Sequence, residues 1–277
     1  MITQKKIYLI LVIFLAVLMR FLYYTHAPGI YVSDDTYAYF EIGQKMLSNK
    51  FFVNDWRTPI YPVLLNLSML FTQSLNSPIL SPVVLANMYK IILLQSFIGI
   101  GTLLILYWFL VKLKVSSFYA LLFVLFTGVN PIVFGWERLL LPESLTVFFL
   151  VTISFVTIRI LQKPTLVFFL ILFLLFVFGV FLRPIYFLLP LGVLAIIIHH
   201  FAKRKILLIN LILLKIFLSI IGIYIISNTQ RGYPGISRAG DINLLGKILQ
   251  FHLPIEAGKD EIIVYDAVSE YRKNYKD

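Results

Sequence analysis

The sequence has 277 residues, of which 60% are hydrophobic and 13% are charged, and its net charge at pH 7 is +11. A globular domain ordinarily carries roughly 25% charged residues, so a soluble protein of this length would lack the polar side chains needed to cover its apolar ones. The absence of cysteine excludes disulfides, thiolate metal sites and a cysteine nucleophile. We therefore expect an all-α integral membrane protein, whose apolar helix faces are solvated by lipid.

The first apolar run, Ile7–Tyr24, has the length of a membrane-spanning helix. No small-residue cleavage site follows it, so we expect a retained anchor rather than a signal peptide. A more polar stretch, residues 25–58, is expected to form the first outer loop. Within this loop, Asp34 and Asp35 precede an amphipathic stretch, Tyr37–Leu47, which is predicted to lie in the membrane interface as a short helix with Tyr37, Phe40 and Leu47 on one side.

Asp34 and Asp35 are compatible with two roles. A carboxylate at the start of a helix caps it and interacts favourably with the helix dipole. A carboxylate at the boundary between lipid and water can also act as a general base. Two adjacent carboxylates can divide these roles, so both interpretations stay open.

The end of the first loop carries Arg57, whose planar guanidinium suits a phosphate and equally suits an interfacial ion pair. The segment that follows, Pro59–Thr72, is less apolar than the spans, and prolines at 59 and 62 disfavour a regular helix. We therefore expect this segment to lie on the outer leaflet or to dip into it without crossing the membrane.

Six further apolar runs complete the set of expected membrane spans. They are Ile91–Val111, Val115–Phe134, Leu145–Leu161, Leu166–Leu182, Ile185–His199 and Ile206–Ile226. Basic clusters lie at residues 5–6, 112–114, 159–163 and 203–205. The positive-inside rule places all four in the cytoplasm, which requires seven spans with the N-terminus cytoplasmic and the C-terminus extracytoplasmic. An arrangement of eight spans, with residues 59–72 as a full crossing, would place half of the clusters outside.

The predicted outer turn, residues 135–144, places Arg138 and Glu143 at the mouth of the helix bundle. Pro142 and Glu143 are typical of the start of a helix, and Arg138 has Glu137 beside it as a partner. An alternative interpretation is that Glu143 contacts a sugar and Arg138 a diphosphate. The residue types alone support both.

Arg183 and Lys215 are cations within apolar sequence. Arg183 falls between two spans with no loop to separate it from either, where a charge is costly and needs a partner such as a lipid phosphate. Lys215 falls near the middle of the last span, so we expect it to face the bundle interior or to extend toward the interface. The four histidines have no zinc-binding spacing, so we expect no zinc. Basic residues dispersed between spans disfavour nucleic acid as a partner.

These motifs, in this order, resemble the GT-C class of polyprenyl-phosphate-sugar-dependent glycosyltransferases, including the aminoarabinose transferases and the protein O-mannosyltransferases. Residues 34–37, Asp-Asp-Thr-Tyr, are similar to the family's Asp-Asp/Glu-x-x-Tyr-type motif in the first outer loop. Residues 57–62, which include Arg57 and Tyr61, are similar to the basic and Pro/Tyr-rich stretch that follows in the family. The entry into a helix through Glu143 and the pair Arg183-Pro184 also have counterparts there.

The resemblance implies a seven-span module with juxtamembrane helices in its first loop, residues 1–226, and a short outer tail, residues 227–277. It implies transfer of a sugar from a polyprenyl-phosphate donor to a hydroxyl of a lipid, glycan or protein at the outer face of the cell membrane. In this mechanism Asp34, beside Asp35, acts on the acceptor hydroxyl, and Glu143 contacts donor or acceptor. The candidates to bind substrate and phosphate are Arg57, Tyr61, Arg138, Arg183 and Lys215. The resemblance also implies that no metal and no other cofactor is needed.

Family members usually run longer, so the chain is expected to be either a relative with a short outer tail or a truncated enzyme. Three alternatives stay open: a non-catalytic relative, a transporter of lipid-linked sugars, and a polysaccharide polymerase. A transporter would typically show inverted repeats and broken helices in mid-membrane, which the sequence does not indicate. The enzyme hypothesis has a geometric requirement: Asp34, Glu143 and at least one of the outer arginines should meet at a single cavity.

Overall fold

A computed structural model describes residues 4–49, 53–54, 56–72, 74–75, 77–78, 81–201 and 204–238. The chain divides into two units, Met1–Ile236 and Ser237–Asp277, and the first is described here. Most of the predicted outer tail, residues 239–277, lies outside the described residues. The elements in chain order are α1 (Gln4–His26), α2 (Asp34–Ser48), α3 (Ile60–Phe71), α4 (Pro82–Lys112), α5 (Ser117–Val129), α6 (Pro131–Gly135), α7 (Glu143–Gln162), α8 (Leu166–Leu182), the 3-10 helix η1 (Pro184–Phe187), α9 (Leu189–His200) and α10 (Arg204–Thr229).

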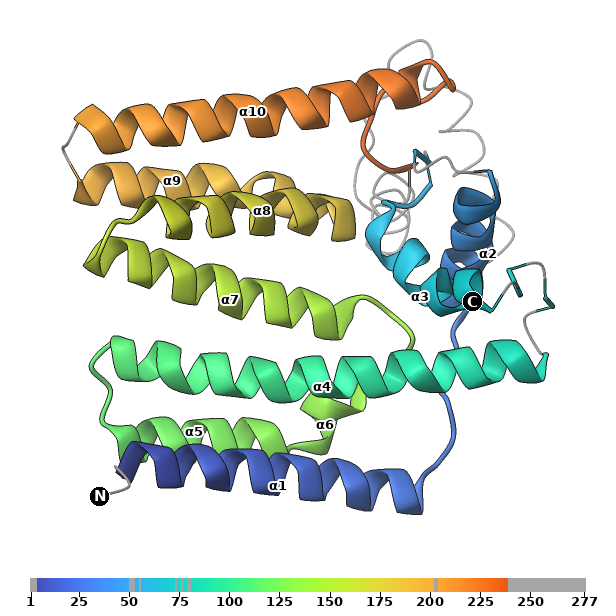
Figure 1. The fold of residues 1–277 in the computed structure, drawn as a ribbon, viewed down its shortest axis with the longest axis horizontal. Coiled ribbons are helices and arrows are strands. Elements are labelled where there is room, and N and C mark those ends of the chain that lie inside the picture. Colours follow the sequence, from blue (N-terminus) through green and yellow to red (C-terminus); the bar gives the residue numbers. More distant parts are fainter. Residues whose placement is uncertain are drawn as a thin grey trace, which may run out of the picture. The chain divides into compact units, whose positions relative to one another are not determined.

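Four of these helices are long and apolar enough to cross a membrane: α1, α4, α7 and, from Lys205 to Thr229, α10. Three shorter apolar helices, α5, α8 and α9, run alongside them with 13, 17 and 12 residues (Figure 1). No strand occurs in the part of the chain that the structure describes. The prediction of an all-α membrane protein is therefore confirmed, whereas the count of seven crossings stays a prediction.

Two of the predicted spans are not continuous helices. The run from residue 115 to 134 divides into α5 and α6, because the Asn130 side chain accepts a hydrogen bond from the Ile132 amide at 2.9 Å and Pro131 has no amide to continue the helix. The run from residue 185 to 199 begins as η1 and becomes α9 only at Leu189. In both places the apolar composition of the run was predicted correctly, but the interruption of the helix at Pro131 and at Pro184 was not.

Helix α4 begins at Pro82 and not at Ile91, where its apolar run starts. The Ser81 hydroxyl caps it by accepting a hydrogen bond from the Val84 amide at 3.4 Å, and proline is favoured in a first turn. The additional turns pack Val84 and Met88 in one core cluster with residues of α2 and α3. This extension explains why α4, with 31 residues, exceeds the length needed to cross a bilayer.

The short helix predicted in the first loop is present as α2, and Ser33 is its cap. Ser33 and Thr36 form a capping box, so Asp34 and Asp35 occupy the first turn. The interpretation that one of the two aspartates caps the helix is therefore wrong. Phe40 and Leu47 are buried as expected, but Tyr37 is 39% exposed. Tyr37 therefore does not belong to the buried face of α2, contrary to the prediction, and Tyr39 is buried beside Phe40 in its place.

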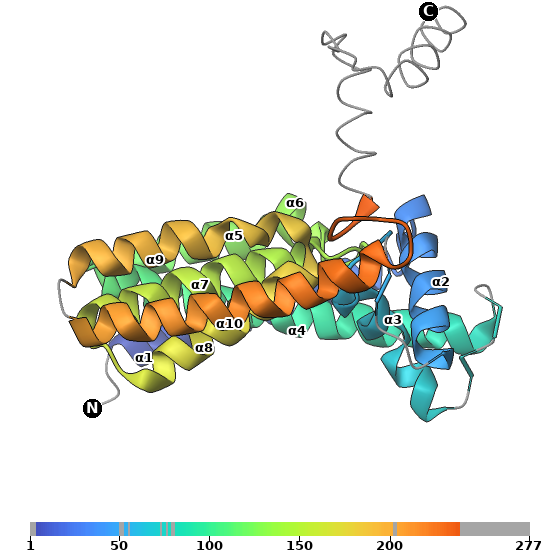
Figure 2. The ribbon, with the colours of Figure 1, turned by 90° about the horizontal axis from the view of Figure 1, so that it is seen from above.

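Helices α2 and α3 lie together at one end of the bundle, beside the extended end of α4 (Figures 1 and 2). A Cβ atom on Gly43 would overlap the Pro62 carbonyl and the Asn66 side chain, so glycine lets the two helices approach closely. The Asn66 amide donates to the carbonyls of Phe40 and Pro62, both at 3.0 Å. These contacts hold α2 against α3 at the end of the bundle.

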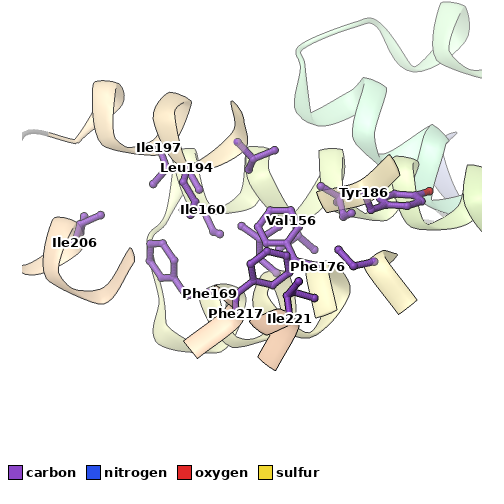
Figure 3. Close-up of a cluster of buried hydrophobic side chains, with 14 residues drawn as sticks. Val156, Ile160, Phe169, Phe176, Tyr186, Leu194, Ile197, Ile206, Phe217 and Ile221 are labelled. Atoms are coloured by element: carbon purple, nitrogen blue, oxygen red, sulfur yellow. The ribbon is translucent and has the colours of Figure 1, made fainter. Parts of the chain in front are cut away.

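Three clusters of buried apolar side chains hold the bundle together. One joins α7, α8, η1, α9 and α10 and includes Phe169, Phe176 and Phe217 (Figure 3). A second joins α2, α3 and the first half of α4, and a third joins α1, α4 and α5. Helix α4 belongs to two of the clusters, so it connects the α1–α5 side of the bundle to the α2–α3 end.

Candidate functional site

A cavity of about 370 Å³ lies between α4, α5, α6 and α7, with α1 contributing one residue. Helix α4 contributes four lining residues at helical spacing, so one face of this helix lies along the cavity. The lining residues are Arg20, Gly99, Thr102, Leu103, Leu106, Thr127, Gly128, Ile132, Val133, Trp136, Glu137, Glu143, Ser144, Thr146, Val147, Val151 and Arg183. Of the residues predicted for the site, this cavity contains Glu143 and Arg183.

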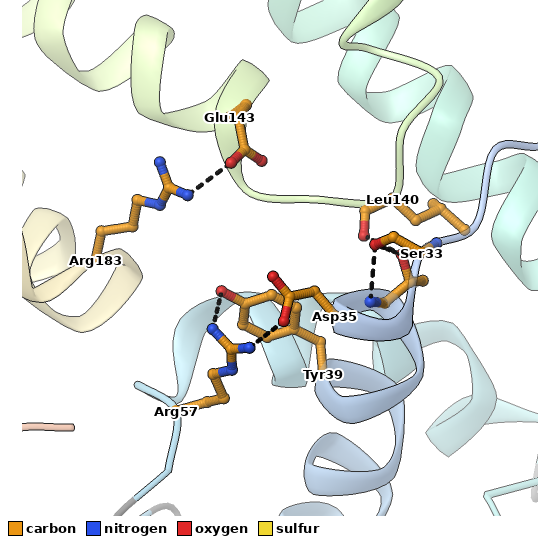
Figure 4. Close-up of polar contacts among 8 residues, drawn as sticks. Ser33, Asp35, Tyr39, Arg57, Leu140, Glu143 and Arg183 are labelled. Atoms are coloured by element: carbon orange, nitrogen blue, oxygen red, sulfur yellow. Dashed lines mark hydrogen bonds and ion pairs between the residues drawn. The ribbon is translucent and has the colours of Figure 1, made fainter. Parts of the chain in front are cut away.

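Glu143 and Arg183 form an ion pair, with Arg183 Nη2 donating to Glu143 Oε1 at 2.6 Å (Figure 4). Glu143 is the first residue of α7, and Arg183 lies in extended backbone directly after α8. Their side chains are 26% and 36% exposed, so the pair is accessible. Arg183 uses only Nη2 among the described residues, which leaves its other N–H groups available to a ligand.

Two polar atoms beside this pair have no hydrogen-bond partner within the described residues. They are Glu143 Oε2 and Ser144 Oγ, and both are buried from solvent. Because Pro142, at the cap position, supplies no side-chain cap, the start of α7 also offers backbone N–H groups. Buried polar atoms ordinarily find a partner, so this corner of the cavity has the character of a binding site for a polar group.

A second ion pair, between Arg20 and Glu137, lines the cavity and is almost fully buried, with side-chain exposures of 7% and 6%. Arg20 Nε donates to Glu137 Oε2 at 2.8 Å, and Arg20 Nη1 donates to the Ala16 carbonyl at 3.0 Å. Burial raises the pKa of the Glu137 carboxyl, and the Arg20 guanidinium counteracts this shift. A Cβ on Gly99 would overlap the Glu137 carboxylate, so glycine makes the space for the pair.

The rest of the cavity is apolar and open to the outside of the bundle. Leu103, Leu106 and Val151 line its interior, whereas several other apolar lining residues are strongly exposed on the protein surface. The exposed ones are Ile132 (76%), Val133 (42%), Trp136 (44%) and Val147 (48%). Ile132, Val133 and Trp136 lie on α6 or directly after it, and Val147 lies on α7, a helix long and apolar enough to cross a membrane. The apolar side of the cavity therefore opens beside α7.

Asp35, Tyr39 and Arg57 form a separate polar group between α2 and the loop before α3. Arg57 Nη2 pairs with Asp35, and the Arg57 guanidinium carbon lies 4.7 Å from the centre of the Tyr39 ring (Figure 4). Burial raises the pKa of the Tyr39 hydroxyl, and the charges of Arg57 and Arg183 counteract this shift. Tyr39 is thus within electrostatic reach of both the Asp35–Arg57 and the Glu143–Arg183 pairs, although neither Asp35 nor Arg57 lines the cavity.

Asp34 is exposed and does not line the cavity. The geometric requirement set out from the sequence is therefore not met in full: Glu143 and Arg183 meet at the cavity, and Asp34 lies outside it. Within the described residues, no three carboxylate or imidazole groups lie close enough together to hold a metal ion.

Arg138 and Tyr61 are internal residues, with exposures of 1% and 0%, and neither lines the cavity. Arg138 donates to the carbonyls of Ala27 and Gly29, and its guanidinium carbon lies 5.0 to 5.5 Å from the rings of three tyrosines. The Tyr61 hydroxyl donates to Gln95 Oε1 at 2.9 Å, and burial raises its pKa. Arg138 therefore holds the first loop against the outer turn, and Tyr61 joins α3 to α4. Their roles in binding substrate and phosphate stay predictions.

Lys215 lies on the exposed face of α10 and does not line the cavity, so of its two expected orientations the one toward the bundle interior is wrong. Helix α10 is apolar on nearly all sides, so the sequence offered no amphipathic pattern from which its orientation could be inferred.

The Arg20–Glu137 pair was not predicted from the sequence. Arg20 is the only charged residue in the run Ile7–Tyr24, and a charge within a span usually has a partner. That signal was present. The partner could not be identified from it, because Glu137 is 117 residues away in the chain.

No protein-family model, no curated protein and no solved structure matches the chain. The likeness to GT-C enzymes therefore rests on short motifs, two of which, around Glu143 and Arg183, meet at the cavity. The site itself combines a guanidinium, a partly unsatisfied carboxylate and an apolar opening, which suits an amphipathic ligand with a phosphate at its polar end.

Proposed function

We propose that this protein is a membrane glycosyltransferase that moves a sugar from a polyprenyl-phosphate donor to an acceptor hydroxyl. The observation that carries the proposal is the two-sided character of one cavity. Its polar corner holds Glu143, Ser144 and Arg183, and its apolar wall opens on the exterior of the spanning helices. A polyprenyl-phosphate sugar has the same division between a charged head and a long apolar chain.

The proposal includes a topology of seven crossings, made by α1, α4, α5 with α6, α7, α8, η1 with α9, and α10. Basic residues at the opposite end of the bundle, in residues 5–6, 112–114, 159–163 and 204–205, favour a cytoplasmic location for that end. The start of α7, the end of α8 and helices α2 and α3 then face the extracytoplasmic side. The donor enters sideways from the outer leaflet.

Arg183 is the residue that we assign to the donor phosphate. Its fork of N–H groups matches phosphate oxygens, and the uncapped start of α7 adds favourable backbone N–H groups. As the bond between the sugar C1 and the phosphate oxygen breaks, the phosphate keeps the electron pair. A fixed cation at this position stabilises the developing charge without reorganisation.

Glu143 is the residue that we assign to the acceptor. Among the carboxylates expected to be catalytic, Glu143 lines the cavity, and its Oε2 atom is free of hydrogen bonds within the described residues. In the reaction the acceptor oxygen forms a bond to C1 from the face opposite the phosphate, and its proton passes to the Glu143 carboxylate. This assignment replaces Asp34, which the motif resemblance favoured but which lies outside the cavity lining.

The experiment is transfer by the purified protein from a panel of radiolabelled polyprenyl-phosphate sugars to membrane lipid, glycan and peptide acceptors. We expect Glu143→Gln to lower the rate by about 100-fold or more, the range typical for a lost general base. Glu41→Gln is the matched control, because Glu41 is an exposed carboxylate of α2 outside the cavity. Asp34→Asn, assayed in parallel, separates the structural assignment from the one based on the motif.

Three results would contradict the proposal. One is wild-type transfer by Glu143→Gln. Another is loss of transfer in Asp34→Asn with Glu143→Gln unaffected, which would return the base to the first loop. The third is a failure of the wild-type protein to bind a polyprenyl phosphate, the product common to every donor in the panel.

A further inference from the structure

Lys215 occupies a position in α10 that isolates its charge. It lies ten residues after Lys205, where the membrane-spanning part of the helix begins, and 14 residues before Thr229, where it ends. At 1.5 Å per residue these separations are about 15 Å and about 21 Å, which a lysine side chain cannot span. The ammonium group therefore lies near the middle of the hydrocarbon layer.

The face of α10 that carries Lys215 is opposite to the face that packs on the bundle. The buried residues of the helix are Ile206, Asn210, Phe217, Ile221, Tyr224 and Asn228. Lys215 belongs to a stripe displaced from these by two positions, or about 200° around the helix. The stripe therefore points away from α8 and α9, on which α10 packs.

This stripe, which we call the α10 outer seam, consists of Leu208, Ile212, Lys215, Ser219, Gly222 and Ile226. Its spacing alternates between four and three residues, which is the pattern of a helix that packs along another helix. A Cβ placed on Gly222 would meet no atom within 4 Å, and Ser219 is exposed. Small residues at such positions let a neighbouring helix in a membrane approach closely.

The described part of the chain contains no carboxylate that can neutralise Lys215. Its acidic residues are Asp34, Asp35, Glu41, Glu137 and Glu143, and none lies in the middle of a spanning helix. Two copies of the chain that met through their α10 outer seams would also place two lysines together. A charge in the hydrocarbon layer is costly unless it is paired, and no described residue of this chain supplies the partner.

We propose that the α10 outer seam binds a transmembrane helix of a partner protein, with an Asp or Glu of that helix paired to Lys215 near the middle of the membrane. Charge complementarity specifies the partner, and the small residues after Lys215 provide the close contact. The surface belongs to a helix that contributes nothing to the cavity lining, so the inference does not depend on the proposed enzymatic function.

The experiment uses the full chain in uncharged phosphatidylcholine liposomes and a synthetic transmembrane peptide of leucine and alanine with one central aspartate. The chain has no cysteine, so Thr229→Cys gives a unique site for a donor fluorophore at the end of α10. The peptide carries the acceptor fluorophore. We expect energy transfer with the aspartate peptide and its loss both in Lys215→Leu and with a leucine at the centre of the peptide.

Two matched variants make the result specific. Lys205→Gln removes a cation from the same helix at its membrane boundary and should leave energy transfer unchanged. Lys215→Glu should abolish binding of the aspartate peptide and create binding of a peptide with a central lysine. Equal energy transfer from the aspartate and leucine peptides, indifference to Lys215→Leu, or transfer between two differently labelled copies in the absence of peptide would overturn the proposal.

Discussion

The two ion pairs of the cavity differ in burial and in hydrogen bonding. Arg20–Glu137 is almost fully buried, and both carboxylate oxygens of Glu137 accept hydrogen bonds from Arg20. Glu143–Arg183 is more than one-quarter exposed, and Glu143 Oε2 lacks a partner within the described residues. A saturated, buried pair holds helices in register, whereas an accessible pair with unused donors and acceptors can exchange its contacts for those of a ligand.

The largest effect should come from breaking the buried pair. Glu137→Gln leaves the Arg20 guanidinium buried without a countercharge, so we expect the free energy of unfolding to fall by about 3–5 kcal/mol. Reversible unfolding in mixed micelles measures this change. The double variant Arg20→Met with Glu137→Met should recover most of the loss, because apolar side chains of similar volume avoid the unpaired charge. A double variant as unstable as Glu137→Gln would argue for a role beyond structure.

A smaller effect should follow from filling the space in which that pair lies. In Gly99→Ala, the new Cβ would overlap the Glu137 carboxylate and come within 3.0 Å of Arg20 Nη2, so we expect a loss of about 1–3 kcal/mol. Gly101→Ala, two residues along the same helix, meets no atom within 4 Å and should be neutral or stabilising. Equal stability of the two variants in the same unfolding assay would show that the carboxylate is not held in place.

The smallest effect on stability should come from the accessible pair. Glu143→Gln removes one charge from a pair that is partly open to solvent, and such pairs contribute about 0–1 kcal/mol. We therefore expect near-normal unfolding together with a large loss of sugar transfer. A loss of stability comparable to that of Glu137→Gln would remove the distinction between the two pairs.

The sequence predicted the helical class and the short helix of the first loop because these depend on local composition and periodicity. The starts of α2 and α4 were predicted too late in the chain, although the sequence contains their cap signals, Ser33 with Thr36 and Ser81 with Pro82. The cavity was beyond prediction, since it depends on how α4 packs between α5 and α7. For the same reason the sequence could not place Arg138, for which pairing with Glu137 and binding of a diphosphate were both open and which is buried against the first loop.

The orientation of α10 illustrates the same limit. Its buried and exposed faces are both apolar, so hydrophobic periodicity could not place Lys215, and only the packing of Phe217 and Ile221 on the neighbouring helices does so.

The central claim, that the accessible pair is a phosphate site, is tested most directly by the dissociation constant of a polyprenyl phosphate measured on the protein in nanodiscs. Charge-assisted hydrogen bonds contribute roughly 1.5–3 kcal/mol, so Arg183→Gln should weaken binding by about tenfold to 100-fold. Lys45→Gln, which removes an exposed cation of α2, should leave the affinity unchanged. Equal affinity of wild type and Arg183→Gln would contradict the account.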